Sequence, residues 1–183
     1  QESRGLGDVY KRQMLISGVV KITYDKKDDE AITKHALINL KNDLTNVLGE
    51  EAILATDSKN SKIIVSTIDT SLAKSQKNYE LLREALNKKE QYIITVFEGK
   101  LQLIGSDRRG TIYAIYEFLN QIGVSPWSYW MDVPIKKQAE IYLNETFFLI
   151  DAPKVEKRGF FINDEWPAAG NWAIKHFGHL VNE

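Results

Sequence analysis

The chain has 183 residues, of which 43% are hydrophobic and 27% charged, with a formal net charge of −1 and no cysteine. This composition is typical of a globular chain with a real core, and the length predicts one domain with at most a second begun. A charge near zero gives no field that attracts nucleic-acid phosphates or anionic lipid, and the lack of cysteine excludes disulfides and thiolate catalysis. We therefore expect no nucleic-acid partner and no membrane partner.

The first thirteen residues are set apart from the rest. The stretch DVYKRQ, residues 8–13, matches the translation of a transposon end that is used to prepare sequencing libraries. Segments of this kind are excluded from fold reasoning, so we assign residues 1–13 to a sequencing-adapter artefact. No export signal is visible in these residues. We expect the natural sequence to start near Met14.

Residues 14–150 are predicted to form an N-terminal α/β domain. Short β-branched runs alternate here with longer amphipathic stretches, which is the pattern of an α/β sandwich. Asp28 or Asp29 is expected to begin the first helix, with apolar residues between 32 and 47 on one face, and Gly49 to end it. The expected strands are residues 19–24, 63–65, 92–97, 101–104 and 140–143, and two further helices are expected at residues 79–86 and 105–123.

The stretch GSDRRG, residues 105–110, leads into the last of these helices. Its glycine spacing is that of a phosphate-binding loop, but Thr111-Ile112 stands where lysine and serine or threonine are needed to hold phosphate and magnesium. We therefore reject a nucleotide site. The turn is instead expected to use Asp107 as a helix cap, with Arg108 and Arg109 solvated or ion-paired.

All four prolines and all four tryptophans follow residue 123. The stretch SPWSYWMDVP, residues 125–134, is too rich in proline and aromatic residues for a helix or a central strand, so we expect an ordered loop. Trp130 in this loop either forms a flat platform for a sugar ring or packs under a domain junction. Residues 151–153 are expected to be the linker that follows the domain.

The stretch RGFFINDEWP, residues 158–167, stops an apolar run at two adjacent carboxylates. Residues 160–162 have the character of a strand that is buried on both faces, as in a barrel covered by helices. Asp164 and Glu165 then lie at the carboxyl end of that strand, where α/β barrels carry their active sites. Adjacent side chains point in opposite directions, so one acid at most faces the barrel axis. The alternative, that both acids only cap the next turn, stays open on spacing alone.

These last motifs carry a family resemblance. The stretch GSDRRGTIYAIYEFLNQIGVSPWSYWMDVP, followed by KRGFFINDEWPAAGNWA, resembles glycoside hydrolase family 115, the xylan α-1,2-glucuronidases, over residues 105–175. The resemblance implies that the α/β domain precedes a (β/α)8 barrel, and that residues 151–183 are the linker and the truncated start of that barrel. It also implies that Asp164 is a catalytic carboxylate. The substrate-binding residues that we expect beside it are Asn163, Glu165, Trp166, Trp172 and Trp130.

The resemblance further implies a reaction, which is removal of glucuronic acid or its 4-O-methyl ether from xylan or a related plant polysaccharide by inversion. Inversion needs two carboxyl groups roughly 6.5–9.5 Å apart, and only one strand end is present, so we expect this chain alone to be inactive. No cofactor is implied, and His176 with His179 lacks a nearby acid to complete a metal site. We expect the complete enzyme to be secreted or periplasmic, and a homodimer is left open. The alternative is a non-catalytic α/β carbohydrate-binding or interaction module.

Overall fold

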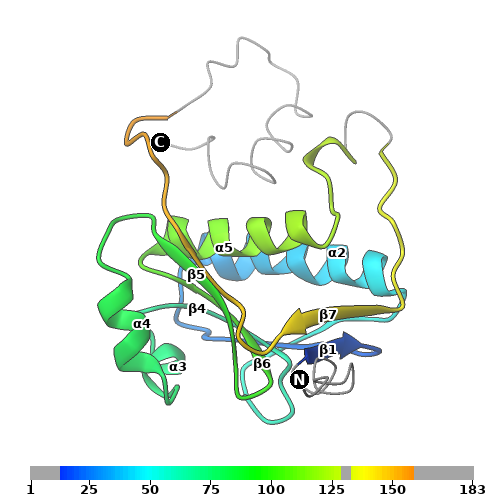
Figure 1. Ribbon diagram of the computed structural model, residues 1–183, viewed down its shortest axis with the longest axis horizontal. Coiled ribbons are helices and arrows are strands. Elements are labelled where there is room, and N and C mark those ends of the chain that lie inside the picture. The colour runs from blue at the N-terminus through cyan, green and yellow to red at the C-terminus, as the bar shows by residue number, and fades with distance from the viewer. Residues whose placement is uncertain (1–12, 129–132, 159–183) are drawn as a thin grey trace, which may run out of the picture.

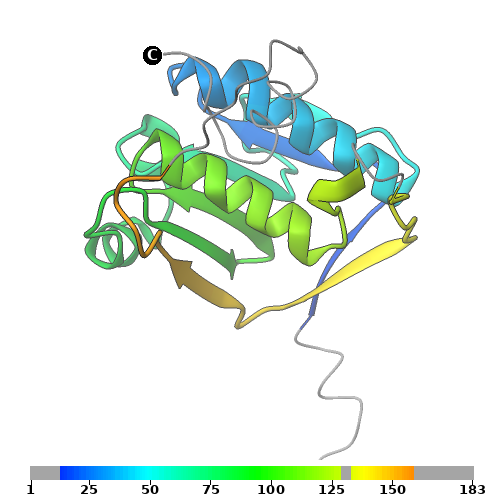
Figure 2. The same ribbon diagram turned by 90° about the horizontal axis from the view of Figure 1, so that it is seen from above.

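The computed structural model describes residues 13–128 and 133–158 of the chain. Six strands form one mixed sheet (Figures 1 and 2). Neighbouring strands β3, β2, β4 and β6 run parallel to one another, while β5 is antiparallel both to β6 and to β8. In sheet order the strands are β3 (Ile53–Ala55), β2 (Lys21–Tyr24), β4 (Ile63–Thr67), β6 (Lys100–Gly105), β5 (Tyr92–Phe97) and β8 (Phe148–Asp151).

Helices cover both faces of this sheet. Helices α2 (Leu37–Leu48) and α5 (Arg108–Gln121) lie side by side on one face, and a π-helical turn, η1 (Ile32–Ala36), leads into α2 (Figure 1). Apolar residues alternate along the strands, so that Ile63 and Val65 join the core under α2 and α5 while Ile64 joins a smaller core. Two short helices, α3 (Ser71–Lys74) and α4 (Tyr79–Ala85), contribute to that second core. The result is the predicted α/β sandwich.

A second, two-stranded sheet joins the two ends of the domain. Strand β1 (Gln13–Ser17) pairs antiparallel with β7 (Glu140–Asn144), and Met14, Ile16 and Ile141 are buried at this junction. Gly18, with φ of 62°, separates β1 from β2, since few residues other than glycine adopt this backbone conformation. The predicted strand over residues 19–24 therefore starts at Lys21. The strand predicted over residues 140–143 is confirmed, with β1 as its partner.

Local sequence signals account for several element ends. Gly49 closes α2 in the left-handed conformation, and its N–H donates to the Thr45 carbonyl at 2.9 Å. Glu98 and Gly99 both have positive φ, the conformation that a two-residue hairpin between β5 and β6 requires. Asp107 caps α5 as predicted. Strands β3 and β8 and helix α3 were not predicted, because each has only three or four residues and too short a pattern to recognise.

The predicted domain boundaries stay predictions. Gln13 already lies in β1, and β8 ends at Asp151. The described part of the predicted loop contains a 3-10 turn, η2 (Pro126–Ser128), with Trp127 53% exposed. The expected strand at residues 160–162 and the barrel that it would begin lie outside the described residues.

The glycines of GSDRRG are explained by close packing. A Cβ atom on Gly110 would lie 2.3 Å from the carbonyl oxygen of Gln91, and one on Gly105 would lie 2.0 Å from the backbone nitrogen of Thr111. Both distances are far inside van der Waals contact, and both neighbours are backbone atoms that cannot rotate away. The first turn of α5 therefore fits against residues 90–91 only when residue 110 has no side chain, and against the end of β6 only when residue 105 has none.

We predict that Gly110→Ala destabilises the domain by about 1–3 kcal/mol, the usual cost of overpacking, measured by denaturant unfolding. Alanine has the better helix propensity by about 1 kcal/mol, so a net loss identifies the steric contact. Gly49→Ala is the comparison, because Gly49 has nothing within 4 Å and only its φ of 74° opposes alanine. Its cost should be about 1 kcal/mol. A Gly110→Ala variant as stable as the wild type would contradict this packing.

Candidate functional site

The site residues predicted from the sequence are not described by the structure. Asp164, its neighbours Asn163 and Glu165, and the tryptophans Trp166, Trp172 and Trp130 all lie outside the described ranges, as do His176 and His179. Their assignments stay predictions. The described residues nevertheless contain a polar network at the start of α5. This network includes Arg158, the last described residue before Gly159.

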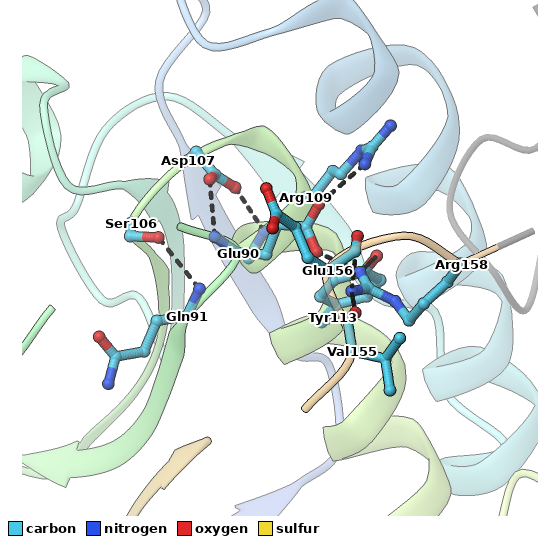
Figure 3. Close-up of polar contacts among 10 residues, drawn as sticks. Glu90, Gln91, Ser106, Asp107, Arg109, Tyr113, Val155, Glu156 and Arg158 are labelled. Carbon is cyan, nitrogen blue, oxygen red and sulfur yellow. Dashed lines mark hydrogen bonds and ion pairs between the residues drawn. The ribbon is translucent and has the colours of Figure 1, made fainter. Parts of the chain in front are cut away.

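Asp107 is the centre of this network (Figure 3). One oxygen of its carboxylate accepts the N–H of Gly110 at 2.9 Å, which caps α5, and the other accepts the N–H of Glu90 at 2.7 Å. Ser106 adds two bonds to Gln91, since its N–H donates to the Gln91 carbonyl at 2.8 Å and its hydroxyl accepts the Gln91 N–H at 3.1 Å. The loop before β5 is thereby fixed to the turn before α5.

Glu90 lies between two arginines. Its carboxylate accepts a hydrogen bond from Arg109 at 2.8 Å and another from Arg158, and its side chain is only 16% exposed. Partial burial acts to raise the pKa of the Glu90 carboxyl, but the hydrogen bonds and charges of Arg158 and Arg109 together outweigh it and hold the pKa below its usual value. Glu90 is therefore an ionised anchor and not a proton donor near neutral pH.

Arg158 reaches this site from the segment after β8. Its guanidinium donates to Glu90 and, at 3.0 Å, to the hydroxyl of Tyr113, and it lies 5.9 Å from the centre of the Tyr113 ring. The guanidinium also binds the carbonyl of Val155 within its own segment (Figure 3). Arg109 and Tyr113 are four residues apart in α5, so both belong to one face of the helix.

The neighbouring strand ends are closed by internal bonds as well. The carboxylate of Asp28, after β2, accepts the N–H of Thr67 at 2.8 Å and its hydroxyl at 2.7 Å, and that hydroxyl lies 3.1 Å from the hydroxyl of Thr111. Arg108 pairs with Asp29 at 3.7 Å. In open α/β sheets this edge, at the carboxyl ends of the parallel strands, is the usual place for ligands. Here its polar groups bind one another, so they hold the ends of neighbouring strands together.

A second polar contact links the two long helices. Tyr116 of α5 accepts a hydrogen bond from the side-chain amide of Asn39 in α2 at 2.9 Å. Burial, with the charge of Asp43 as a lesser cause, raises the pKa of the Tyr116 hydroxyl to about 12. Tyr116 therefore stays neutral and serves as a link between the helices.

The described residues contain neither a grouped set of metal-binding side chains nor a membrane-spanning helix. Within residues 13–128 and 133–158, no three His, Asp or Glu side chains are grouped so that they could hold a metal ion. In the same ranges no helix is long and apolar enough to cross a bilayer.

Sequence analysis identified Asp107 as the helix cap and left Arg108 and Arg109 as solvated or ion-paired, of which the structure shows ion pairs. It missed Glu90 and Arg158. These two residues are 68 positions apart. A pattern within a local window gives no signal for such a pair. The positive φ of Glu90, 58°, marks it as unusual only once the structure is known.

A family model described as Glycosyl hydrolase family 67 N-terminus matches residues 11–118, which is 108 of the 183 residues. The chain belongs to this family. Among curated proteins, no sequence match was found. The family match covers the whole sheet except β8 and includes Glu90, Asp107 and Arg109.

Solved structures agree with a relation to glycoside hydrolases. A family GH115 4-O-methyl-α-glucuronidase with specificity for decorated arabinogalactans is 32% identical, with a TM-score of 0.74, over 90% of this chain and 22% of that one. The Flavobacterium johnsoniae GH20 chitobiase is 13% identical, with a TM-score of 0.52, over 80% of this chain and 19% of that one. The second likeness shows a shared fold only. The present chain spans about a fifth of the length of each of these enzymes.

We predict a pH dependence for the Glu90 anchor. Because folding lowers the pKa of Glu90 from its ordinary value of 4.5, its ionised form stabilises the fold above that pH and loses this contribution as pH falls through the lower, folded value. Glu90→Gln should cost about 1–2 kcal/mol at neutral pH, the range for a charged hydrogen bond that is partly exposed. The difference in thermal unfolding temperature between wild type and variant should be constant from pH 7 to about 5 and shrink in more acidic buffer. A difference that persists unchanged to about pH 3 would contradict the charged anchor.

Proposed function

We propose that this chain is the N-terminal part of a family 115 glycoside hydrolase that removes glucuronic acid, or its 4-O-methyl ether, from xylan or a related plant polysaccharide. The observation that carries the proposal is the 32% identity to a family GH115 4-O-methyl-α-glucuronidase over 90% of this chain. The family 67 match supports the same reaction class, since both are α-glucuronidase families. The named specificity of that relative, decorated arabinogalactans, widens the range of substrates that a test must include.

In this proposal the chemistry belongs to the part of the protein that follows Arg158. The carboxylates of the described network, Asp28, Asp107 and Glu90, are occupied by hydrogen-bond donors and ion pairs. A general acid or base must instead face substrate with a pKa suited to proton transfer. Asp164 is the proposed active-site carboxylate, with Asn163, Glu165 and the three tryptophans Trp166, Trp172 and Trp130 as proposed substrate contacts.

An inverting mechanism requires two carboxyl groups. One protonates the leaving oxygen, and the other activates a water molecule that fits between them. We propose that the partner of Asp164 comes from a later strand of a (β/α)8 barrel. The present chain alone is then inactive. Because its substrate is a plant polysaccharide, the complete protein is proposed to be secreted or periplasmic. A homodimer of the complete protein is compatible with the proposal.

The proposal predicts that the complete polypeptide releases glucuronic acid from glucuronoxylan or from a decorated arabinogalactan, and that Asp164→Ala lowers kcat by about 10²–10⁴-fold. A carboxylate that serves chemistry adds little to packing, so the thermal unfolding temperature should change little. Glu165→Ala is the comparison: an adjacent side chain points away from that of Asp164, so the loss of this substrate contact should raise KM and lower kcat much less.

Residues 1–183 alone serve as the blank of this experiment and should release no sugar acid. Release by this chain would contradict the assignment of catalysis to later residues. If the complete polypeptide binds the polysaccharide without cleaving it, the chain is part of a non-catalytic carbohydrate-binding module instead. Normal kcat in Asp164→Ala together with a large loss in Glu165→Ala would reverse the roles of the two acids.

A further inference from the structure

The segment that leaves the sheet after β8 is exposed at residues 154–158, and the Arg158 side chain joins it to the domain. The guanidinium has two partners on separate elements: Glu90, before β5, and Tyr113, in α5. Asp164 follows Arg158 by six residues. A contact at Arg158 therefore fixes the chain shortly before the proposed active-site acid.

The receiving side of this contact is also held by bonds that do not involve Arg158. The Glu90 backbone is bonded to Asp107, and its carboxylate is already held by Arg109 at 2.8 Å. Glu90 also has a φ of 58°, a left-handed conformation that costs a residue with a side chain about 1–2 kcal/mol. Such conformations persist where surrounding contacts enforce them, and they concentrate at positions with a role beyond folding.

We propose that Glu90 and Tyr113 are positioning residues, which hold Arg158 and so set the point from which the segment with Asp164 starts. This proposal rests on the proposed function. The two residues do not touch substrate, and they act through Arg158. A misplacement of about 1 Å at a reacting group costs on the order of 100-fold in rate, so a fixed starting point has a direct effect on turnover.

The first arm of the test measures kcat and KM for glucuronic acid release by the complete polypeptide. Glu90→Gln and Arg158→Gln should each lower kcat about 10-fold or more with little change in KM. The double variant should lower kcat no further, because both substitutions remove the same contact between Glu90 and Arg158. Arg158→Lys keeps the charge and should recover part of the loss. Additive losses in the double variant, or normal kcat in both single variants, would overturn the proposal.

Arg108→Gln is the matched control for effects on stability alone. Arg108 neighbours Arg109 in the first turn of α5 and pairs with Asp29, away from Arg158. The Arg108→Gln variant loses a more exposed ion pair, which joins atoms 3.7 Å apart, and should keep normal kcat. An equal fall in kcat in Arg108→Gln would show that the losses reflect general loosening of the domain, which would overturn the positioning role.

The second arm needs no enzymatic activity and uses residues 1–183 with trypsin, which cleaves only when the arginine side chain is free to enter the protease. In the wild type, cleavage after Arg158 should be slow relative to cleavage after the exposed Lys154. Glu90→Gln should raise the ratio of the Arg158 rate to the Lys154 rate at least about 10-fold, as expected when release of the Arg158 side chain limits cleavage. Equal ratios in the wild type and in Glu90→Gln would overturn the proposed hold of Glu90 and Tyr113 on Arg158, whatever the enzyme assays show. A protected Arg158 in a complete polypeptide that releases no sugar acid would instead overturn the proposed function and, with it, the positioning of Asp164.

Discussion

The carboxylate of Asp107 is the interaction on which the arrangement of this domain depends. Its two oxygens bind the N–H groups of Gly110 and Glu90, so one side chain both begins α5 and fixes the loop that enters β5. Charged hydrogen bonds of this kind are about twice as strong as neutral ones. The glycines on either side let the backbones approach closely enough for these bonds to form. The GSDRRG motif is thus a joint between backbone segments.

This joint explains how a domain without a described catalytic group would contribute to the glycoside hydrolase that we propose. The Asp107 carboxylate accepts the N–H of Glu90, the Glu90 carboxylate accepts from Arg158, and Arg158 belongs to the segment that leaves the sheet after β8. Each link is a charged or backbone hydrogen bond, so each is directional and specifies orientation as well as contact. The domain therefore provides a defined exit for the chain, and the chemistry that we propose lies beyond that exit.

The parts of the fold that sequence analysis predicted correctly are those with local causes. Gly49 ends α2 and Asp107 caps α5, and in each case the residue type is required by backbone conformation or by an unpaired N–H group. Pairings between distant segments gave no such signal. The β1–β7 sheet, the edge position of β8 and the Glu90–Arg158 pair depend on which surfaces meet after folding, and a window of neighbouring residues does not contain that information. Asp164 and the tryptophans around it were predicted from resemblance, and they stay predictions.

The most direct test of the account is the hydrogen-exchange rate of two backbone amides, Glu90 and Gly110, measured by NMR in the wild type and in Asp107→Ala. The account predicts that both amides exchange slowly in the wild type and that both become fast in the variant, because one carboxylate accepts from both. An amide of Glu90 that exchanges in the wild type as fast as an exposed loop would show that the joint does not hold, and the link from Asp107 to Arg158 would then have to be abandoned.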